Sequence, residues 1–392
     1  MNKKIFVGVM LACLIVFTVI SVPQADAQKT VTITDSLGNR VKLPYPVERV
    51  VNVNTFGNEV IVALGGEDKL VGIDMTPLSQ PEFYPTLQDK PTVGLHHFPN
   101  YEMIIDLNPQ VVIYESDLTF LPGFREKIEK AGITPVCLNL WDPATYDSDI
   151  RNLGIILGKE ERAEEYLNFS HSYIRMVEDR VRDIPPGERV RVYWESPFPY
   201  TTMAKGSPMD KLIGLVRGTN VFSGAGGSEF RMPIGASAIS GTVAPEMEIA
   251  TGLHLRTVSQ EAIVEANPQV IIGELVPMEV LTVGGIMMMR GKPYLMPIGY
   301  TSAVPKPDIL KNTRDKIMSR PGSMEIDAVK NERVHSYAFS MLLTSARWPA
   351  GMIYLAKNFY PDRFEDVDPD EFHAEWLKKW NGLEYKGLWV YP

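Results

Sequence analysis

One short phrase occurs twice in this sequence, at widely separated places. Residues 102–115 read EMIIDLNPQVVIYE and residues 261–274 read EAIVEANPQVIIGE. In each copy, apolar residues at helical spacing lead to an Asn-Pro break and then to a run of β-branched residues, which predicts a helix, a turn and a strand. A unit repeated at this distance favours two similar α/β lobes over a solenoid. Two such lobes that face each other form a cleft, and clefts between domains are where small ligands bind.

The first 27 residues are typical of a targeting segment rather than of a folded domain. A basic start at Lys3-Lys4 precedes an apolar run at 5–22, and Ala25-Asp26-Ala27 has the small-x-small pattern of a cleavage site. The apolar run is also long enough for an uncleaved membrane anchor, and it contains a weak lipoprotein-box signal. All three interpretations place residues 28–392 outside the cytoplasmic membrane, in the periplasm or at the cell surface.

Charge and cysteine content argue against several classes of protein. The formal net charge is −9, and because residues 1–27 hold two lysines and one aspartate, the rest of the chain carries about −10. This charge argues against a nucleic-acid-binding protein and is compatible with docking onto a basic partner surface. Cys137 is the one cysteine after residue 27, so no internal disulfide is expected. Its apolar surroundings, ITPVCLNL, predict a buried strand thiol.

Alternating strand and helix patterns along the chain predict mainly parallel, helix-covered sheets. A β-hairpin is expected at 31–43, around a Leu-Gly-Asn turn. The other predicted strands are 49–54, 70–73, 133–138, 189–194 and 334–338, and the predicted helices are 58–64, 124–130, 210–216, 349–358 and 369–380.

The segment 159–184 predicts one long amphipathic helix, which Pro185-Pro186-Gly187 ends. A single long helix between two α/β halves would be a stiff connector, although an ordinary domain helix has the same periodicity. We therefore expect an N-terminal lobe at 28–158, a bridging helix at 159–184 and a C-terminal lobe at 185–392.

The usual catalytic signatures are absent from the sequence. It contains no G-x-S-x-G, no H-E-x-x-H and no G-x-G-x-x-G after a strand. Of the six histidines, only His96 and His97 are close in sequence. Adjacent side chains on a strand point apart, and a dedicated zinc site uses more clustered ligands. We therefore expect neither an enzyme nor a resident metal or cofactor.

The chain resembles the substrate-binding proteins of ABC importers for iron-siderophore, haem or cobalamin, the helix-bridged class III of periplasmic binding proteins. The resemblance covers residues 31–382 and includes both NPQV units. Its other segments, in order, are DSLGNRVKLPYPVERVV, NEVIVALGGEDKLVGID, PTVGLHH, GLVRGTNVF, VSQEAI, AVKNERVHSY and RWPAGMIYLAKNFYPDRFEDVDPDEF. The resemblance implies two Rossmann-like lobes with mainly parallel sheets, joined by one long helix and moving little on binding. Such a fixed cleft suits a large, rigid ligand.

The resemblance also implies that each lobe carries one exposed glutamate that docks onto arginines of the membrane permease. Glu102 and Glu261, in PNYEMI and VSQEAI, match these positions. A carboxylate can form strong charge-assisted bonds with a guanidinium group. The alternative interpretation is that both are first-turn glutamates, which the helix dipole favours, and both interpretations can hold together.

Ligand-binding residues of such a fold are expected on loops that follow the carboxyl ends of strands. The candidates are Asn54, Thr55, Tyr84, His96, His97, Trp194, Arg231, Arg347 and Trp348.

The candidate side chains suggest three kinds of contact. Trp194 and Tyr84 would stack on the ligand, whereas packing within a lobe is their alternative role. Arg231 and Arg347 would neutralise acidic groups of a ligand, unless they are solvated or paired with surface acids. His96 or His97 could supply an axial nitrogen to a bound metal complex, or form a polar surface pair. Met287, Met288 and Met289 suggest a flexible apolar patch or a soft-metal site. Glu195 is acidic, so the predicted cleft would not be purely basic.

We therefore expect an exported, monomeric binding protein that captures an iron chelate or a corrinoid and delivers it to an ABC permease. The alternative cargo is a bare metal ion or a simple metal complex. The alternative class is an extracytoplasmic sensor or enzyme that reuses the fold.

Overall fold

The described part of the chain covers most of both predicted lobes. A computed structural model describes residues 29–96, 98–116, 118, 123–196, 198–224, 228–229, 231–234, 247–250, 255–275, 288–289, 292–293, 299–300, 308–338, 342–343 and 345–392. For the strand segments at 228–229, 231–234, 247–250, 288–289 and 292–293 it describes the backbone alone. Within the described ranges, no helix has both the length and the hydropathy that crossing a membrane requires.

The N-terminal half forms a four-stranded parallel sheet, in the order β4-β3-β7-β8. The residues of β7 are all buried, as expected for a parallel sheet with both faces covered. The predicted hairpin is also present as the antiparallel pair β1–β2. The strands are β1 (Thr30–Thr34), β2 (Arg40–Pro44), β3 (Val50–Asn52), β4 (Leu70–Ile73), β5 (Gly94–Leu95), β6 (Phe98–Pro99), β7 (Val111–Tyr114) and β8 (Thr134–Cys137). The helices are α1 (Gly57–Leu64), α2 (Thr76–Ser79), α3 (Tyr101–Asp106), α4 (Phe124–Lys130) and α5 (Tyr146–Leu157).

The C-terminal half contains a second sheet, in the order β11-β9-β16-β19-β20, in which only β20 is antiparallel. Its strands are β9 (Arg191–Glu195), β11 (Thr219–Asn220), β16 (Val270–Leu275), β19 (Val334–Ala338) and β20 (Val390–Tyr391). Shorter pieces are β10 (Thr201–Met203), β12 (Ser228–Glu229), β13 (Arg231–Ile234), β14 (Met247–Ala250), β15 (Leu255–Thr257), β17 (Met288–Met289) and β18 (Lys292–Pro293). The helices are α7 (Pro208–Leu215), α9 (Gln260–Ala266), α11 (Asp308–Met318), α12 (Asp327–Lys330), α13 (Trp348–Phe359), α14 (Pro369–Trp376) and the π-helical segment η7 (Leu377–Asn381).

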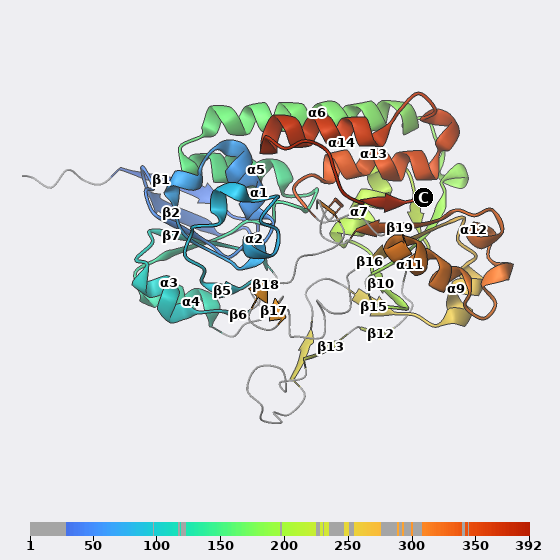
Figure 1. Ribbon diagram of the computed structural model, residues 1–392, viewed down its shortest axis with the longest axis horizontal. Helices are drawn as coiled ribbons and strands as arrows, with labels where there is room; N and C mark the ends of the chain where they lie inside the picture. The colour runs from blue at the N-terminus through green and yellow to red at the C-terminus, as the bar shows by residue number, and fades with distance from the viewer. Residues whose placement is uncertain are drawn as a thin grey trace, which may run out of the picture.

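The two sheets share one topology. Numbered along the chain, the strands β3, β4, β7 and β8 lie in the order 2-1-3-4, and so do β9, β11, β16 and β19. Each copy of the repeated phrase supplies the third strand of its sheet. The predicted pair of α/β lobes with mainly parallel sheets is therefore confirmed, and the two lobes lie side by side below one long helix (Figure 1).

The Asn-Pro-Gln core of the repeat clamps the third strand to the start of the first strand. In the N-terminal lobe, the side-chain oxygen of Gln110 accepts hydrogen bonds from the backbone N–H groups of Glu48 and Arg49, at 2.6 and 3.1 Å. The Arg49 Nε group donates in return to the backbone oxygen of Asn108, at 2.9 Å. The motif thus ties two neighbouring strands together at the edge of the sheet opposite their carboxyl ends.

The C-terminal lobe contains the same clamp. The side-chain oxygen of Gln269 accepts from the backbone N–H of Arg191 at 3.0 Å, and Arg191 Nη2 donates to the backbone oxygen of Asn267 at 2.9 Å. Asn108 and Asn267 both have left-handed backbone conformations, with φ of 45° and 41°. Asparagine tolerates this conformation better than most residues, which explains its place in both copies.

The helix α6 spans Glu160–Val181, close to the predicted 159–184. It runs along the top of the molecule over both lobes (Figure 1) and packs against α5 of the N-terminal half and α13 of the C-terminal half. Its buried residues are Ala163, Tyr166, Leu167, Ser170, Tyr173, Val177 and Val181. The bridging helix is thus confirmed, while the domain limits at residues 158 and 184 stay a prediction.

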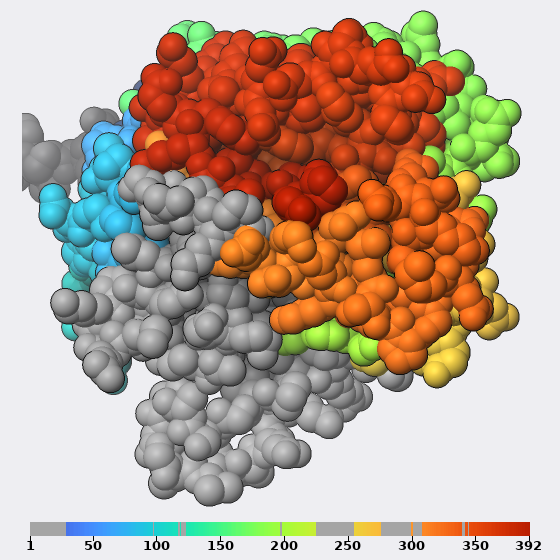
Figure 2. All heavy atoms as spheres, turned by 45° about the vertical axis from the view of Figure 1, so that its right-hand side comes forward, coloured from blue at the N-terminus to red at the C-terminus, as the bar shows by residue number. Residues whose placement is uncertain are grey.

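The C-terminal residues return across the molecule to the N-terminal lobe. Trp376 and Trp380 contact Tyr166 of α6, with ring centroids 5.3 and 4.8 Å apart, and η7 packs against α1. Further along, Lys386 forms an ion pair with Glu82. Figure 2 shows these C-terminal residues, in red, as a continuous layer across the upper part of one face. The two lobes are therefore joined by packed side chains as well as by α6.

We expect Gln110→Ala and Gln269→Ala each to lower the free energy of unfolding by about 1–2 kcal/mol, because backbone N–H groups of the first strand lose their acceptor. Urea unfolding followed by tryptophan fluorescence measures the change. Gln80→Ala is the control, since the Gln80 side chain forms no hydrogen bond with any described residue. Equal stability of all three variants would show that the clamp is not stabilising.

Candidate functional site

The carboxyl ends of the first and third strands meet at the switch point of each sheet, where open α/β sheets bind ligands. In the N-terminal lobe, Thr55 follows β3 and Glu115 follows β7. The Thr55 backbone N–H donates to Glu115 Oε1 at 3.0 Å, and the Thr55 hydroxyl lies 3.4 Å from Asp74 Oδ2. Thr55 is partly exposed, whereas Glu115 and Asp74 are buried. The predicted residue Thr55 thus lies at the edge of a polar cluster.

His96 joins the same cluster. Its Nδ1 lies 2.8 Å from the backbone oxygen of Val53 and 3.5 Å from Glu115 Oε1. Because a carbonyl oxygen only accepts hydrogen bonds, Nδ1 carries a proton in this contact. A histidine whose Nδ1 is bonded to a carbonyl is oriented as metal-ligating histidines commonly are.

The switch point of the C-terminal lobe holds a buried ion pair. Glu195, at the end of β9, accepts from the two terminal guanidinium nitrogens of Arg320, Nη1 and Nη2, at 2.6 and 2.7 Å. It also accepts from the Tyr193 hydroxyl at 2.9 Å and from the Tyr200 backbone N–H at 3.1 Å. The Arg320 guanidinium lies over the Tyr200 ring, 4.3 Å from its centroid. The charge of Glu195 is therefore balanced locally, by an arginine that sequence analysis missed because it lies far away, after α11.

Glu274 occupies the position in the second repeat that Glu115 occupies in the first. It is buried at the end of β16 and accepts a hydrogen bond from Trp194 Nε1 at 3.1 Å. Burial raises the pKa of Glu274 to about 8, although the Trp194 bond counteracts the shift. Trp194 itself is fully buried and lies against Tyr337, so its ring is part of the lobe interior.

Arg347 connects the two lobes. It precedes α13 and is 1% exposed, and its Nε lies 2.6 Å from Glu59 Oε1 on α1. Its Nη1 donates to His373 Nε2 at 2.9 Å. Burial and the neighbouring guanidinium hold the pKa of His373 well below its usual range, so this ring is a neutral acceptor. Burial raises the pKa of Glu59 to about 7, and Arg347 opposes that shift.

Aromatic rings enclose this inter-lobe pair. The Arg347 guanidinium lies over Phe83 and Trp389, 4.7 and 5.0 Å from their centroids. Tyr84 is buried beside Phe83, with ring centroids 4.8 Å apart. The predicted residue Tyr84 therefore packs behind the inter-lobe contact.

Trp348 and the segment before it also contact the first lobe. The Trp348 ring packs edge-on against Tyr146 of α5 at 5.2 Å. The hydroxyls of Tyr146 and Tyr166 both donate to the backbone oxygen of Ala346, at 3.0 and 3.4 Å. These bonds position the start of α13 against α5 and α6.

Asn54 is fully buried and organises the start of α1. Its amide nitrogen donates to the backbone oxygen of Leu138, and its side-chain oxygen accepts from the Gly57 N–H at 2.8 Å. Two partly exposed rings nearby were not predicted: Phe56 and Trp141, whose centroids lie 5.8 Å apart. Phe56 directly follows the predicted Asn54-Thr55 pair, and this adjacency was the signal that could have revealed it.

Three predictions fall partly or wholly outside the described residues. His97 and Met287 are not described. Arg231, Met288 and Met289 lie in β13 and β17, for which the structure describes the backbone alone. Among the described residues, no group of three or more His, Cys, Asp or Glu side chains is placed to hold a metal ion.

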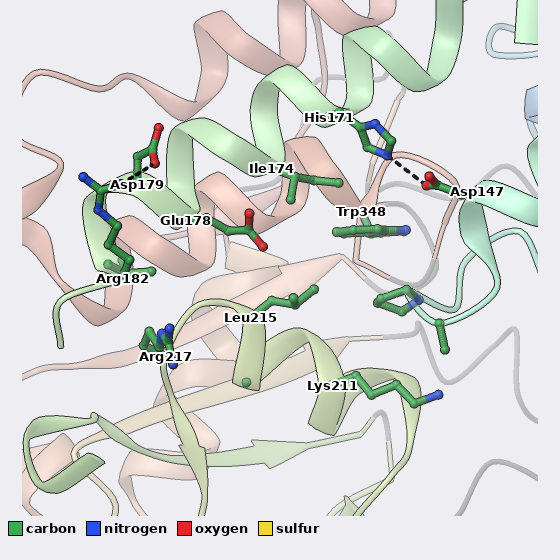
Figure 3. Close-up of a pocket in the computed structure, with 14 residues that line it drawn as sticks. Asp147, His171, Ile174, Glu178, Asp179, Arg182, Lys211, Leu215, Arg217 and Trp348 are labelled. Atoms are coloured by element: carbon green, nitrogen blue, oxygen red, sulfur yellow. Dashed lines mark hydrogen bonds and ion pairs between the residues drawn. The ribbon is translucent and has the colours of Figure 1, made fainter. Parts of the chain in front are cut away.

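A groove of about 850 Å³ lies between the bridging helix and α7 (Figure 3). Trp348 forms its centre, and the His171–Asp147 pair, at 2.9 Å, closes one end. Trp348 is the one predicted ligand residue in its lining. The groove is thus built from helices, and it is separate from the carboxyl ends of the strands.

Comparisons with known proteins agree with this fold. The profile of a family described as periplasmic binding protein matches residues 50–339. The ABC transporter substrate-binding lipoprotein YvrC of Bacillus subtilis is 24% identical, over 86% of this chain and 87% of that protein. The molybdate-binding protein MolA of Haemophilus influenzae is 22% identical, over 90% and 92%. Its molybdate-bound structure has a TM-score of 0.64, with 19% identity over 91% of this chain and 99% of that chain.

A third similarity is partial. The vitamin B12-binding protein of Vibrio cholerae is 22% identical over 46% of this chain and 63% of that protein. All of these identities are low, so the structural likeness establishes the shared fold and leaves the cargo open.

We expect Glu274→Gln to be more stable than the original chain at alkaline pH. Between pH 4.5 and about 8 the folded protein keeps a proton on Glu274 that the unfolded chain releases. The stability associated with this carboxyl group is therefore fully present below pH 4.5 and falls as the pH rises. The glutamine variant should equal the original near pH 4.5 and exceed it by on the order of 5 kcal/mol at pH 8.5.

Urea unfolding at several pH values measures this difference. Glu265→Gln, at an exposed position, is the control. A glutamine variant that is less stable than the original at pH 8.5 would show that Glu274 is ionised in the folded protein.

We expect Arg347→Met to lower the free energy of unfolding by about 3–5 kcal/mol, because it leaves Glu59 buried without its counter-ion. The double variant Glu59→Gln, Arg347→Met should lose less than the sum of the two single changes. A double-mutant cycle in urea measures the coupling. Strict additivity would mean that the pair does not join the lobes energetically.

Proposed function

Because the chain belongs to the periplasmic binding protein family and acts as the substrate-binding protein of an ABC transporter, we propose that its cargo is a metal chelate, either an iron siderophore or haem, or a corrinoid. It would bind this cargo outside the cytoplasmic membrane as a monomer and deliver it to the membrane permease. Residues 1–27 would direct its export, as a signal peptide or as an N-terminal anchor.

The observation that carries this proposal is the pair of switch points joined by a buried inter-lobe contact. The Glu59–Arg347 pair and the Tyr146 and Tyr166 bonds to Ala346 connect the lobes through ordered, buried groups. A cleft between lobes connected in this way is largely pre-formed, and a pre-formed cleft binds a large, rigid ligand with little ordering cost.

Partly exposed side chains at the switch points would contact the cargo. In the first lobe these are Thr55 and His96, with the newly found rings Phe56 and Trp141 as stacking surfaces. His96 would supply an axial nitrogen to the metal of the cargo, and the bond from its Nδ1 to Val53 would orient the ring.

The remaining predicted residues would have two kinds of role. Arg231 and His97 stay proposed ligand contacts. The buried predicted residues would hold the lobes and the strand ends in place rather than touch the ligand, and they are Asn54, Tyr84, Trp194, Arg347 and Trp348.

A simple metal complex is the second candidate cargo. MolA is a molybdate-binding protein, and the similarity to it extends over nearly the whole length of both proteins. This similarity favours a simple metal complex as the cargo. The extracytoplasmic sensor or enzyme is the third candidate, and the binding proteins among the relatives argue for a non-catalytic role instead.

Glu102 and Glu261 would dock onto the permease. Each is an exposed residue in the first turn of its helix, after the N-caps Asn100 and Ser259. Neither carboxylate forms an ion pair with a described residue. Both are therefore available to arginines of a partner, although the helix dipole also favours glutamates here.

The cargo is tested by purifying the protein from its native host and recording its absorption spectrum and metal content. The apoprotein is then titrated with haemin, cyanocobalamin, a ferric catecholate and molybdate, with intrinsic fluorescence as the signal. We expect tight, stoichiometric binding of one of the first three. Tight binding of molybdate alone, or of a bare metal ion, would support the second candidate, and turnover of a substrate would refute both.

The docking role predicts that the double variant Glu102→Ala, Glu261→Ala binds its ligand normally but no longer stimulates ATP hydrolysis by the reconstituted permease. The matched control is Glu126→Ala, Glu371→Ala, which removes two exposed first-turn glutamates elsewhere. Full stimulation by the first double variant would contradict the docking role.

A further inference from the structure

Large apolar side chains are exposed at few places in the described structure, and these places are unevenly distributed. Four such residues are exposed by more than two fifths: Leu37 (44%), Met103 (41%), Ile105 (44%) and Met324 (71%). Met103 and Ile105 lie on α3, immediately beside Glu102. Large exposed apolar residues that gather at one place mark interaction surfaces more often than scattered ones do.

Met324 has the corresponding place in the other lobe. It lies in the 3-10 turn η5 (Ser323–Glu325), which packs against α11 and α12. Gln260, the residue before Glu261, donates through Nε2 to Ser323 Oγ at 3.3 Å. In each lobe, an exposed methionine thus lies either on the helix of the proposed docking glutamate or in a turn that contacts that helix.

The exposed apolar side chains belong to different elements in the two lobes. Ala262 and Val264 occupy the positions of Met103 and Ile105, and both are only partly exposed. Val264 lies against Gly322, where an added Cβ atom would be 3.3 Å from its side chain. The neighbouring turn therefore covers the helix face in the second lobe and exposes its own methionine in exchange. In Figure 1, α3 and α9 lie at the lower corners of the two lobes, on the side away from α6.

We propose that Met103, Ile105 and Met324 are the apolar part of the surface that contacts the membrane permease, beside Glu102 and Glu261. The proposal rests on the permease-docking role of the two glutamates. An exposed ion pair contributes little by itself and is weakened by salt, so two such pairs alone would give a loose complex. Methionine is enriched in interfaces and adapts to irregular surfaces, and salt does not screen its contribution as it screens that of an ion pair.

The test compares three variants at low and at high salt, with the permease reconstituted in nanodiscs. The first replaces all three apolar residues, as Met103→Gln, Ile105→Gln and Met324→Gln, and the second is the double variant Glu102→Ala, Glu261→Ala. The third is Leu37→Gln, the matched control, which removes an equally exposed apolar side chain in the β1–β2 turn. Circular dichroism and thermal unfolding show whether each variant is folded.

We expect the triple glutamine variant to bind the permease roughly tenfold to a hundredfold more weakly at both salt concentrations, because apolar burial is lost. The glutamate variant should bind more weakly at low salt, and its defect should shrink at high salt. Leu37→Gln should bind like the original chain. Binding of the cargo probe identified above should be unchanged in all three.

Several outcomes would overturn the proposal. If the triple variant binds normally while the glutamate variant is defective, docking holds and the apolar surface is excluded. If neither variant is defective, the docking role itself fails. If the triple variant loses affinity equally for protein-free lipid nanodiscs, the three side chains contact lipid rather than permease. A defect as large in Leu37→Gln would show a general effect of apolar loss.

Discussion

The buried ion pair between Glu59 and Arg347 is the contact on which the arrangement of the two lobes depends. One partner lies on α1 in the first lobe, and the other precedes α13 in the second. Removing two charges from water is costly, and the cost is recovered only where geometry and further bonds are good. Here His373 accepts a hydrogen bond from Arg347, and aromatic rings exclude water. The pair therefore specifies one relative position of the lobes.

The fold could be predicted from sequence to the extent that its signals are local. The hairpin, the helix 124–130 and the strand 70–73 depend on turn residues and periodicity within a few positions, and the structure reproduces them closely. The helix α5 was missed, since its first turn carries the polar residues Asp147, Ser148 and Asp149, which obscure the apolar periodicity. The order of the strands within a sheet was not predictable. The repeated phrase predicted only that the two sheets would have similar topologies.

The site was less predictable, because its contacts join residues far apart in sequence. Sequence reasoning placed Arg347 in a cleft, but could not show that Glu59 lies within 2.6 Å of it. Similarly, Glu195 gave no sign of its pairing with Arg320, more than a hundred residues later. The position of a residue at a strand end predicts that the residue lies near a cleft. Whether its side chain is buried depends on the helices that pack over the strand end. Thr55 remained accessible for this reason and Asn54 did not.

With the docking role proposed for Glu102 and Glu261, the two lobes would give the molecule two points of attachment to its partner. Once one lobe has met its partner surface, the second contact forms within the same complex, at an effective concentration that the spacing between the lobes determines. The Glu59–Arg347 pair limits changes in that spacing. The second contact would therefore form with a geometry that the protein fixes in advance. A fixed spacing between Glu102 and Glu261 would thus favour a partner whose two binding sites lie at the matching distance.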